Sequence, residues 1–191
     1  MSINLAVFAS GSGTTLQAII DSIENKKLDA KISIVVSNNP DAYALERARK
    51  AGIPTYIITS KGIENIDNEL SEVLKDYEID LIVLAGYLRK IGDKLLARYR
   101  IINTHPSLLP KFGGKGMHGM HVHQAVIDAG EKISGVTVHF VNDEYDSGSI
   151  IRQTTVDVLD TDDAESLSAK VQKAEKIQLV EVLNDFSKGV I

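Results

Sequence analysis

The sequence predicts an α/β fold with a doubly wound, mostly parallel sheet and helices on both faces. Two observations support this prediction. Short apolar runs alternate along the chain with segments whose apolar residues recur at helical spacing. Several runs are continuously apolar, which is typical of parallel strands buried on both faces. Strands and helices in this order predict right-handed crossovers and a Rossmann-like first half.

The first half contains four predicted strands and three predicted helices. The strands are short apolar or β-branched runs at residues 5–9, 32–36, 55–58 and 81–84. From the spacing of apolar residues, we expect one helix to begin at Thr14 or Thr15 and two more at residues 44–51 and 66–77.

The pattern changes after residue 100. A short strand is expected at residues 101–103, and residues 104–119 are rich in Gly without an apolar period, which predicts a long loop. The remaining elements are a helix at 122–129, strands at 135–140 and 150–158, and a helix at 165–186. No linker separates these elements, so we expect a single domain over residues 1–191.

The composition excludes several classes of protein. With 191 residues, 43% hydrophobic and 25% charged, the chain is typical of one globular domain. The absence of Cys excludes disulfides, thiolate metal sites and Cys nucleophiles. A net charge of −5 without a basic cluster argues against nucleic-acid binding. Without a membrane-length apolar run or an N-terminal targeting signal, we expect a soluble, cytoplasmic protein.

The segment Gly11-Ser12-Gly13-Thr14-Thr15 lies between the first strand and the first helix. Gly allows a ligand to approach the backbone, and the free N–H groups of a helix start attract phosphate. The alternative is a tight turn with a capping Thr. A dinucleotide site would need a third Gly where Leu16 stands and a carboxylate near residues 37–39. We therefore expect a phosphate monoester site rather than an NAD or ATP site.

Asn103 and His105 follow the strand at 101–103, where an open α/β sheet binds its ligands. His suits proton transfer near neutral pH, and an Asn amide can donate to a developing oxyanion. The alternative is a polar loop whose His satisfies local backbone groups. Asp146 lies in an acidic turn; beside His105 it would raise the imidazole pKa, and otherwise it is an exposed turn residue.

Three further histidines, His118, His121 and His123, resemble a metal cluster. No acidic or Cys partner is spaced to complete a tetrahedral site, so we expect a polar loop leading into a helix and no metal.

Four segments, at residues 9–17, 84–89, 103–110 and 138–148, occur in an order that resembles the phosphoribosylglycinamide formyltransferases over nearly the whole chain. Asn-x-His-Pro-Ser-Leu-Leu-Pro with a downstream Asp is specific to folate formyltransferases, and the early Gly-rich turn narrows the match to this branch. The resemblance implies the formyltransferase fold and formyl transfer from 10-formyltetrahydrofolate to the amine of 5′-phosphoribosylglycinamide, in purine (IMP) biosynthesis. The products would be 5′-phosphoribosyl-N-formylglycinamide and tetrahydrofolate.

The resemblance also implies roles for individual residues and for the two halves of the domain. Residues 1–100 would bind phosphate, and residues 101–191 would bind folate and carry the catalytic groups. Asn103 would contact the formyl donor, His105 would donate a proton and Asp146 would raise its pKa. The substrate phosphoribosyl group would contact Gly13, Thr14, Thr15, Lys61 and Glu175. The folate would contact Leu88, Arg89, Lys90, Ile91 and Asn103.

Three positions depart from the family pattern. The family's Ser-Asn is Thr14-Thr15, its Arg near positions 61–63 is Lys61, and the loop at 111–119 is longer than in some members. We expect small-molecule partners only, without metal, nucleic acid or membrane, and a monomer or weak homodimer.

Alternative functions are a formyl-folate hydrolase, a methionyl-tRNA formyltransferase, a phosphate sensor and a nicotinamide dehydrogenase. By resemblance, the first carries an extra N-terminal domain and the second an extra C-terminal domain. The predicted elements extend from residue 5 to residue 186, and we expect neither extension. A sensor would not need Asn103, His105 and Asp146 together, and a dehydrogenase lacks its carboxylate after the second strand.

Overall fold

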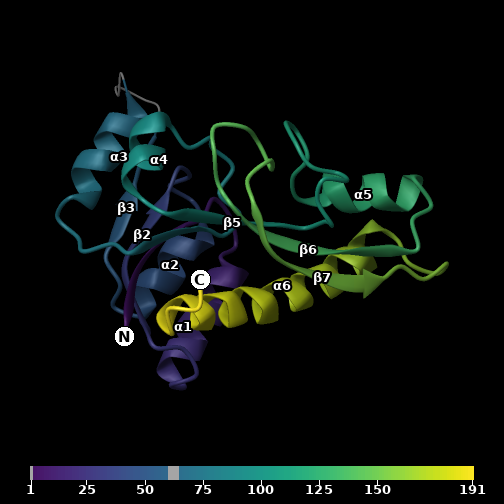
Figure 1. Ribbon diagram of the computed structural model, residues 1–191, viewed down its shortest axis with the longest axis horizontal. Helices are drawn as coiled ribbons and strands as arrows, with labels where there is room; N and C mark the ends of the chain where they lie inside the picture. The colour runs from purple at the N-terminus through teal and green to yellow at the C-terminus, as the bar shows by residue number, and fades with distance from the viewer. Residues whose placement is uncertain (1, 60–64) are drawn as a thin grey trace.

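The computed structural model describes residues 2–59 and 65–191. In these ranges the strands form one sheet with the order β3-β2-β1-β4-β5-β6-β7 (Figure 1). The strands are β1 Ile3–Phe8, β2 Ala30–Ser37, β3 Thr55–Ile57, β4 Leu81–Leu84, β5 Ile101–His105, β6 Ile133–Phe140 and β7 Ile150–Asp157. The helices are α1 Thr14–Glu24, α2 Tyr43–Lys50, α3 Ile66–Leu74, α4 Asp93–Arg98, α5 Met120–Asp128 and α6 Ala164–Ser187.

Strands β1 to β5 are parallel, and β6 and β7 extend the sheet with antiparallel pairing. The chain runs outward from β1 to β3, and then returns to place β4 and β5 on the other side of β1. This reversal leaves a crevice beyond the carboxyl ends of β1 and β4, where open α/β sheets bind ligands. The prediction of a mostly parallel, doubly wound sheet is confirmed.

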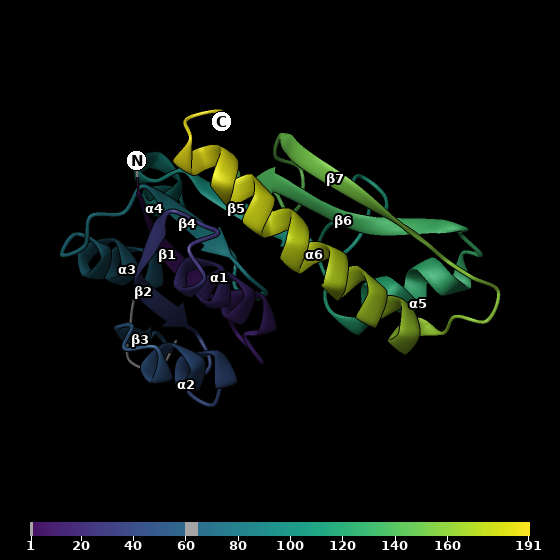
Figure 2. The ribbon, with the colours of Figure 1, turned by 90° about the horizontal axis from the view of Figure 1, so that it is seen from below.

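Both faces of the parallel part of the sheet are covered by helices. Leu5 and Val7 pack in a core with α1, α2 and α6, whereas Ala6 and Phe8 pack in a second core with α3 and α4. Since alternate residues of a strand face opposite layers, this two-sided burial explains why the first strand is continuously apolar. Figure 2 shows α6 extending from this part of the molecule toward α5, and both helices pack beside β6 and β7.

Several predicted boundaries differ from the structure by up to three residues, and the helix expected at 66–77 ends at Leu74. Two differences have a clear structural cause. Residues Thr104 and His105 were expected in a loop, but they belong to β5 because they pair with Val138 and Thr137 of β6. Helix α4 was not predicted. Its N-terminus is capped by another helix, since the Asp67 carboxylate of α3 accepts a hydrogen bond of 2.7 Å from the Lys94 N–H. Both differences arise from partners distant in sequence, which local periodicity does not report.

Candidate active site

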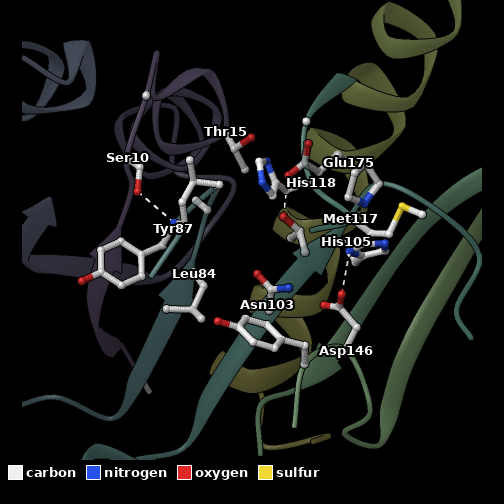
Figure 3. Close-up of a pocket in the computed structure, with 18 of the residues that line it drawn as sticks. Ser10, Thr15, Leu84, Tyr87, Asn103, His105, Met117, His118, Asp146 and Glu175 are labelled. Atoms are coloured by element: carbon white, nitrogen blue, oxygen red, sulfur yellow. Dashed lines mark hydrogen bonds and ion pairs between the residues drawn. The ribbon is translucent and has the colours of Figure 1, made fainter. Parts of the chain in front are cut away.

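A cavity of about 460 Å³ lies beyond the carboxyl ends of the central strands. Its walls come from the turn before α1, the segment after β4, the end of β5, the loops after β5 and β6, and one side of α6 (Figure 3). The predicted site residues in the described ranges all line it: Gly13, Thr14, Thr15, Leu88, Arg89, Lys90, Ile91, Asn103, His105, Asp146 and Glu175. Lys61 lies outside the described residues.

Strand pairing sets the positions of the polar groups at the end of β5. Asn103 and His105 are two residues apart on a strand, so their side chains point to the same face. In the antiparallel partner β6, His139 lies opposite Asn103 and Thr137 lies opposite His105. The Asn103 amide nitrogen is 3.2 Å from Nε2 of His139. The register of two strands therefore places an amide and two imidazoles beside one another.

Asp146 comes from the loop between β6 and β7 and lies between the two imidazoles. Its Oδ2 is 3.4 Å from Nδ1 of His105, and its Oδ1 is 3.6 Å from Nε2 of His139. The Gly114 N–H donates a hydrogen bond of 2.8 Å to the same Oδ2. Asp146 has a φ of 54°, in the left-handed region that few residues other than Gly adopt. The structure thus brings together His105 and Asp146 from distant segments (Figure 3).

Backbone carbonyls fix which ring nitrogens carry protons. Nε2 of His105 is 2.8 Å from the Phe112 carbonyl, and Nδ1 of His139 is 2.8 Å from the Phe140 carbonyl. A carbonyl only accepts, so each of these nitrogens is the N–H donor. In neutral His139 the other nitrogen, Nε2, then accepts from the Asn103 amide. The second amide hydrogen of Asn103 stays available to the cavity, where it suits an oxyanion.

The pKa of His105 differs from the sequence expectation. Burial lowers it, and this effect outweighs the Asp146 carboxylate and the Phe112 carbonyl, which both raise it. Asp146 acts in the expected direction, but the His105 side chain is only 4% exposed and the net pKa is lowered. For Asp146 itself, burial raises the pKa, but its contacts with His139 and His105 and the hydrogen bond from the Gly114 N–H together lower it. Burial therefore favours the neutral imidazole of His105, whereas the contacts of Asp146 favour its carboxylate.

The turn before α1 presents backbone N–H groups. Gly13 is the N-cap residue with a φ of 68°, and no side chain caps this helix end. The first turn contains no acidic residue that would compete with an anion. A Cβ atom on Gly13 would lie 2.7 Å from Cα and Cβ of Ala44, so the position requires Gly for its conformation and for space.

Glu175 of α6 lies beside this turn. Its carboxyl group accepts a hydrogen bond from the Thr104 hydroxyl, and the Thr15 hydroxyl also acts to lower its pKa. Thr15 and Glu175 both line the cavity in Figure 3. Burial raises the pKa of Glu175, and the two hydroxyls only partly oppose this effect. The raised pKa favours the neutral acid, a form that can both donate to and accept from a sugar hydroxyl.

The segment after β4 forms the opposite wall of the cavity. The Leu88 N–H donates to Oγ of Ser10 at 2.9 Å, and Ile91 is buried in the core beneath, which fixes the backbone path. The Lys90 ammonium lies 6.0 Å from the ring centre of Tyr145, so this wall contacts the loop that carries Asp146.

Three histidines that line the cavity, His118, His123 and His139, were not recognised as site residues from the sequence. His139 is 2% exposed and contacts Asn103. The signal that identifies it is a matching alternation, because Asn103 and His105 lie two apart on β5 as Thr137 and His139 do on β6. His123 is also 2% exposed and lines the cavity, and its Nδ1 has no hydrogen-bond partner among the described residues.

The described residues give no indication of a metal site or a membrane span. The rings of His118 and His121 pack edge to face with centres 5.7 Å apart. No group of three or more His, Cys, Asp or Glu in the described ranges is placed to hold a metal ion. None of the helices in the same ranges is long and apolar enough to cross a membrane.

Comparisons with known proteins agree with this geometry. Phosphoribosylglycinamide formyltransferase of Haemophilus influenzae is 39% identical over 190 residues, which cover 97% of this chain and 87% of the relative. The chloroplastic phosphoribosylglycinamide formyltransferase of Arabidopsis thaliana is 40% identical over 185 residues, 94% of this chain. The chain spans 63% of the Arabidopsis relative and 59% of a chloroplastic relative from Vigna unguiculata.

Solved structures show the same fold. The crystal structure of glycinamide ribonucleotide transformylase 1 from Symbiobacterium toebii matches with a TM-score of 0.92 and 37% identity, covering 98% of this chain and 89% of that chain. A family model described as formyl transferase matches residues 3–183. On this match, which covers nearly the whole sequence, the chain belongs to the formyl transferase family.

Proposed function

We propose that the protein transfers the formyl group of 10-formyltetrahydrofolate to the amine of 5′-phosphoribosylglycinamide. One observation carries the proposal: Asn103, His105 and Asp146 meet in a cavity that also contains a phosphate-binding type of turn. The products are 5′-phosphoribosyl-N-formylglycinamide and tetrahydrofolate, and the reaction belongs to purine biosynthesis. The family and the names of its relatives support this choice.

The two substrates occupy opposite ends of the cavity in this proposal. Gly13, Thr14 and Thr15 bind the phosphate, with Lys61 as a further contact, and Glu175 binds the ribose. Residues 88–91 bind the folate largely through backbone groups, and Asn103 contacts its formyl group. The raised pKa of Glu175 fits this role, since it disfavours the charged carboxylate, which would oppose binding of the phosphate nearby.

The catalytic groups act on the oxygen of the transferred formyl group and on the proton that moves from the amine to N10. The substrate amine forms a C–N bond to the formyl carbon, the bond from that carbon to N10 of the folate breaks, and the proton lost by the amine ends on N10. His105 takes the proton lost by the amine and then passes it to N10, and in between its imidazolium and the free Asn103 N–H stabilise the oxyanion. Asp146 stabilises the imidazolium, because its carboxylate lies 3.4 Å from Nδ1 of His105. General acid help of this kind is worth roughly 10²–10⁴ in rate.

Incubation of the purified protein with 5′-phosphoribosylglycinamide and 10-formyltetrahydrofolate tests the proposal. We expect tetrahydrofolate to accumulate only when both substrates are present. Deformylation without the ribonucleotide would indicate a hydrolase, and binding of both compounds without turnover would indicate a sensor.

The organisation around this activity is also proposed. We propose a single domain in which residues 1–100 bind the phosphate and residues 101–191 bind folate and carry the catalytic groups. We further propose a cytoplasmic monomer or weak homodimer that takes only small-molecule partners. Sedimentation at several protein concentrations measures the oligomeric state.

A further inference from the structure

Helix α2 contacts the turn that precedes α1 through two hydrogen bonds to its carbonyls. The Ala44 N–H donates to the Gly11 carbonyl at 3.1 Å, and Nε of Arg47 donates to the Ser12 carbonyl at 2.8 Å. Nη1 of Arg47 also donates to Oε1 of Gln17 at 3.0 Å, which fixes the guanidinium between α1 and α2. Arg47 is half-buried and does not line the cavity.

These two contacts determine where the N–H groups of the turn point. In a planar trans peptide the C=O and the following N–H point in opposite directions. Because the Gly11 and Ser12 carbonyls face α2, the N–H groups of Ser12 and Gly13 point away from α2. The N–H groups of Thr14 and Thr15 point out of the start of α1.

The resulting set of donors is free to bind an anion. In the part of the chain that the structure describes, the N–H groups of Ser12, Gly13, Thr14 and Thr15 donate no hydrogen bond. The same residues line the cavity. Consecutive N–H groups that converge in this way form an anion-binding concavity.

We propose that Arg47 is a positioning residue for the substrate phosphate: it holds the Ser12 carbonyl on α2 and so directs the Gly13 N–H toward the phosphate. The inference rests on the proposed function, because it takes the substrate's phosphate as the group bound there. Arg47 does not touch the phosphate itself. Its positive charge behind the turn adds to the attraction for a dianion.

Steady-state kinetics of Arg47→Gln test this role. We expect KM for the ribonucleotide to rise about tenfold, the effect of losing one charged hydrogen bond. KM for the formyl donor and the thermal midpoint stay near wild type. Arg49→Gln is the matched control: it removes the same charge from the same helix, but Arg49 is exposed and its side chain pairs with Glu46 at 3.8 Å rather than with the turn, so we expect no change.

A second variant and a second readout separate the possible failures. Gln17→Met keeps α1 helical and removes the acceptor that orients Arg47, so it raises KM for the ribonucleotide by a few-fold even if Arg47→Gln does not fold. Binding of ribose 5-phosphate, measured by calorimetry, tests the turn without any formyl transfer. Wild type that binds ribose 5-phosphate but shows no turnover would overturn the proposed function alone. Equal ribonucleotide KM and ribose 5-phosphate affinity in wild type, Arg47 and Gln17 variants would overturn the role of Arg47.

Discussion

The two ends of the cavity are built from different parts of the chain. At the start of α1 the donors are backbone N–H groups, and their direction depends on the φ of Gly13 and on contacts with α2. At the end of β5 the functional groups are side chains, brought together by the pairing of β5 with β6. The first arrangement depends on backbone path and tolerates several side chains, whereas the second depends on strand register and on three particular residue types. Substitutions at the two ends should therefore affect different kinetic constants.

The largest effect is expected at the side-chain end. His105→Ala removes the group that stabilises the oxyanion as an imidazolium, and we expect kcat to fall by roughly 10²–10⁴. His121→Gln is the control, because His121 is exposed on the neighbouring helix and does not line the cavity. Circular dichroism and turnover are measured for both variants. A folded His105→Ala protein with near-normal kcat would refute the catalytic role of this residue.

A large effect on binding is expected at the backbone end. Gly13→Ala places a Cβ atom 2.7 Å from Ala44 at a positive φ, so the turn must move away from α2. We expect KM for the ribonucleotide to rise at least tenfold, an order-of-magnitude expectation for a lost phosphate contact, with KM for the formyl donor unchanged.

Gly130→Ala is the control that separates the steric clash at position 13 from the free-energy cost of a positive φ. Gly130 has a φ of 65°, but among the described residues no atom beyond its chain neighbours would lie within 4 Å of an added Cβ atom, and it does not line the cavity. This variant should lose about 1–2 kcal/mol of stability and keep both KM values. If Gly13→Ala likewise lowered stability and left both KM values unchanged, the turn would not be the phosphate site.

The same contrast explains what the sequence could predict. The Gly-rich turn was recognisable because Gly itself reports an unusual backbone and because it follows a continuously apolar strand. Asn103 and His105 were recognisable as candidates from their place after a strand. His139 was not, since its role depends on lying opposite Asn103 across a strand pair, and the register of that pair is not visible in either segment alone.

Electrostatics was the least predictable part of the site. A carboxylate beside His105 was expected to raise its pKa, and Asp146 does so. The larger effect is burial, because the histidine lies within a strand that is covered by the loop carrying Phe112. The sequence indicated a loop there, and a loop histidine would have stayed hydrated. Because the end of β5 was predicted to be a loop, the net shift expected for the pKa of His105 had the wrong sign.

A moderate effect is expected from His139, which supports Asn103. His139→Phe removes the nitrogen that accepts from the Asn103 amide, 3.2 Å away, and we expect kcat to fall about tenfold because one hydrogen bond is lost. The double variant with Asn103→Ala gives the coupling between the two residues. Since His139 acts through Asn103, the second substitution should add little to the loss from Asn103→Ala. Additive losses would show that His139 acts independently.

The smallest expected effect is a change in the pKa of His105. Asp146 raises the pKa of His105 against the larger effect of burial, so Asp146→Asn should lower that pKa further. The ring resonances of His105, followed by NMR against pH in wild type and variant, measure the change. A His105 pKa that stayed the same or rose in Asp146→Asn would contradict the pairing of these two groups.

The same titration has a consequence for stability. The folded-state pKa of His105 lies below the unfolded value of about 6.5, so the unfolded chain binds more protons as pH falls through that value. The histidine therefore removes stability progressively from about pH 6.5 down to its folded-state pKa. In Asp146→Asn the lower folded-state pKa extends this window to more acidic pH. Urea unfolding of wild type and variant between pH 7 and pH 5 should then show the steeper loss in the variant, because the Asp146 carboxylate, which helps the buried imidazole accept a proton, is gone.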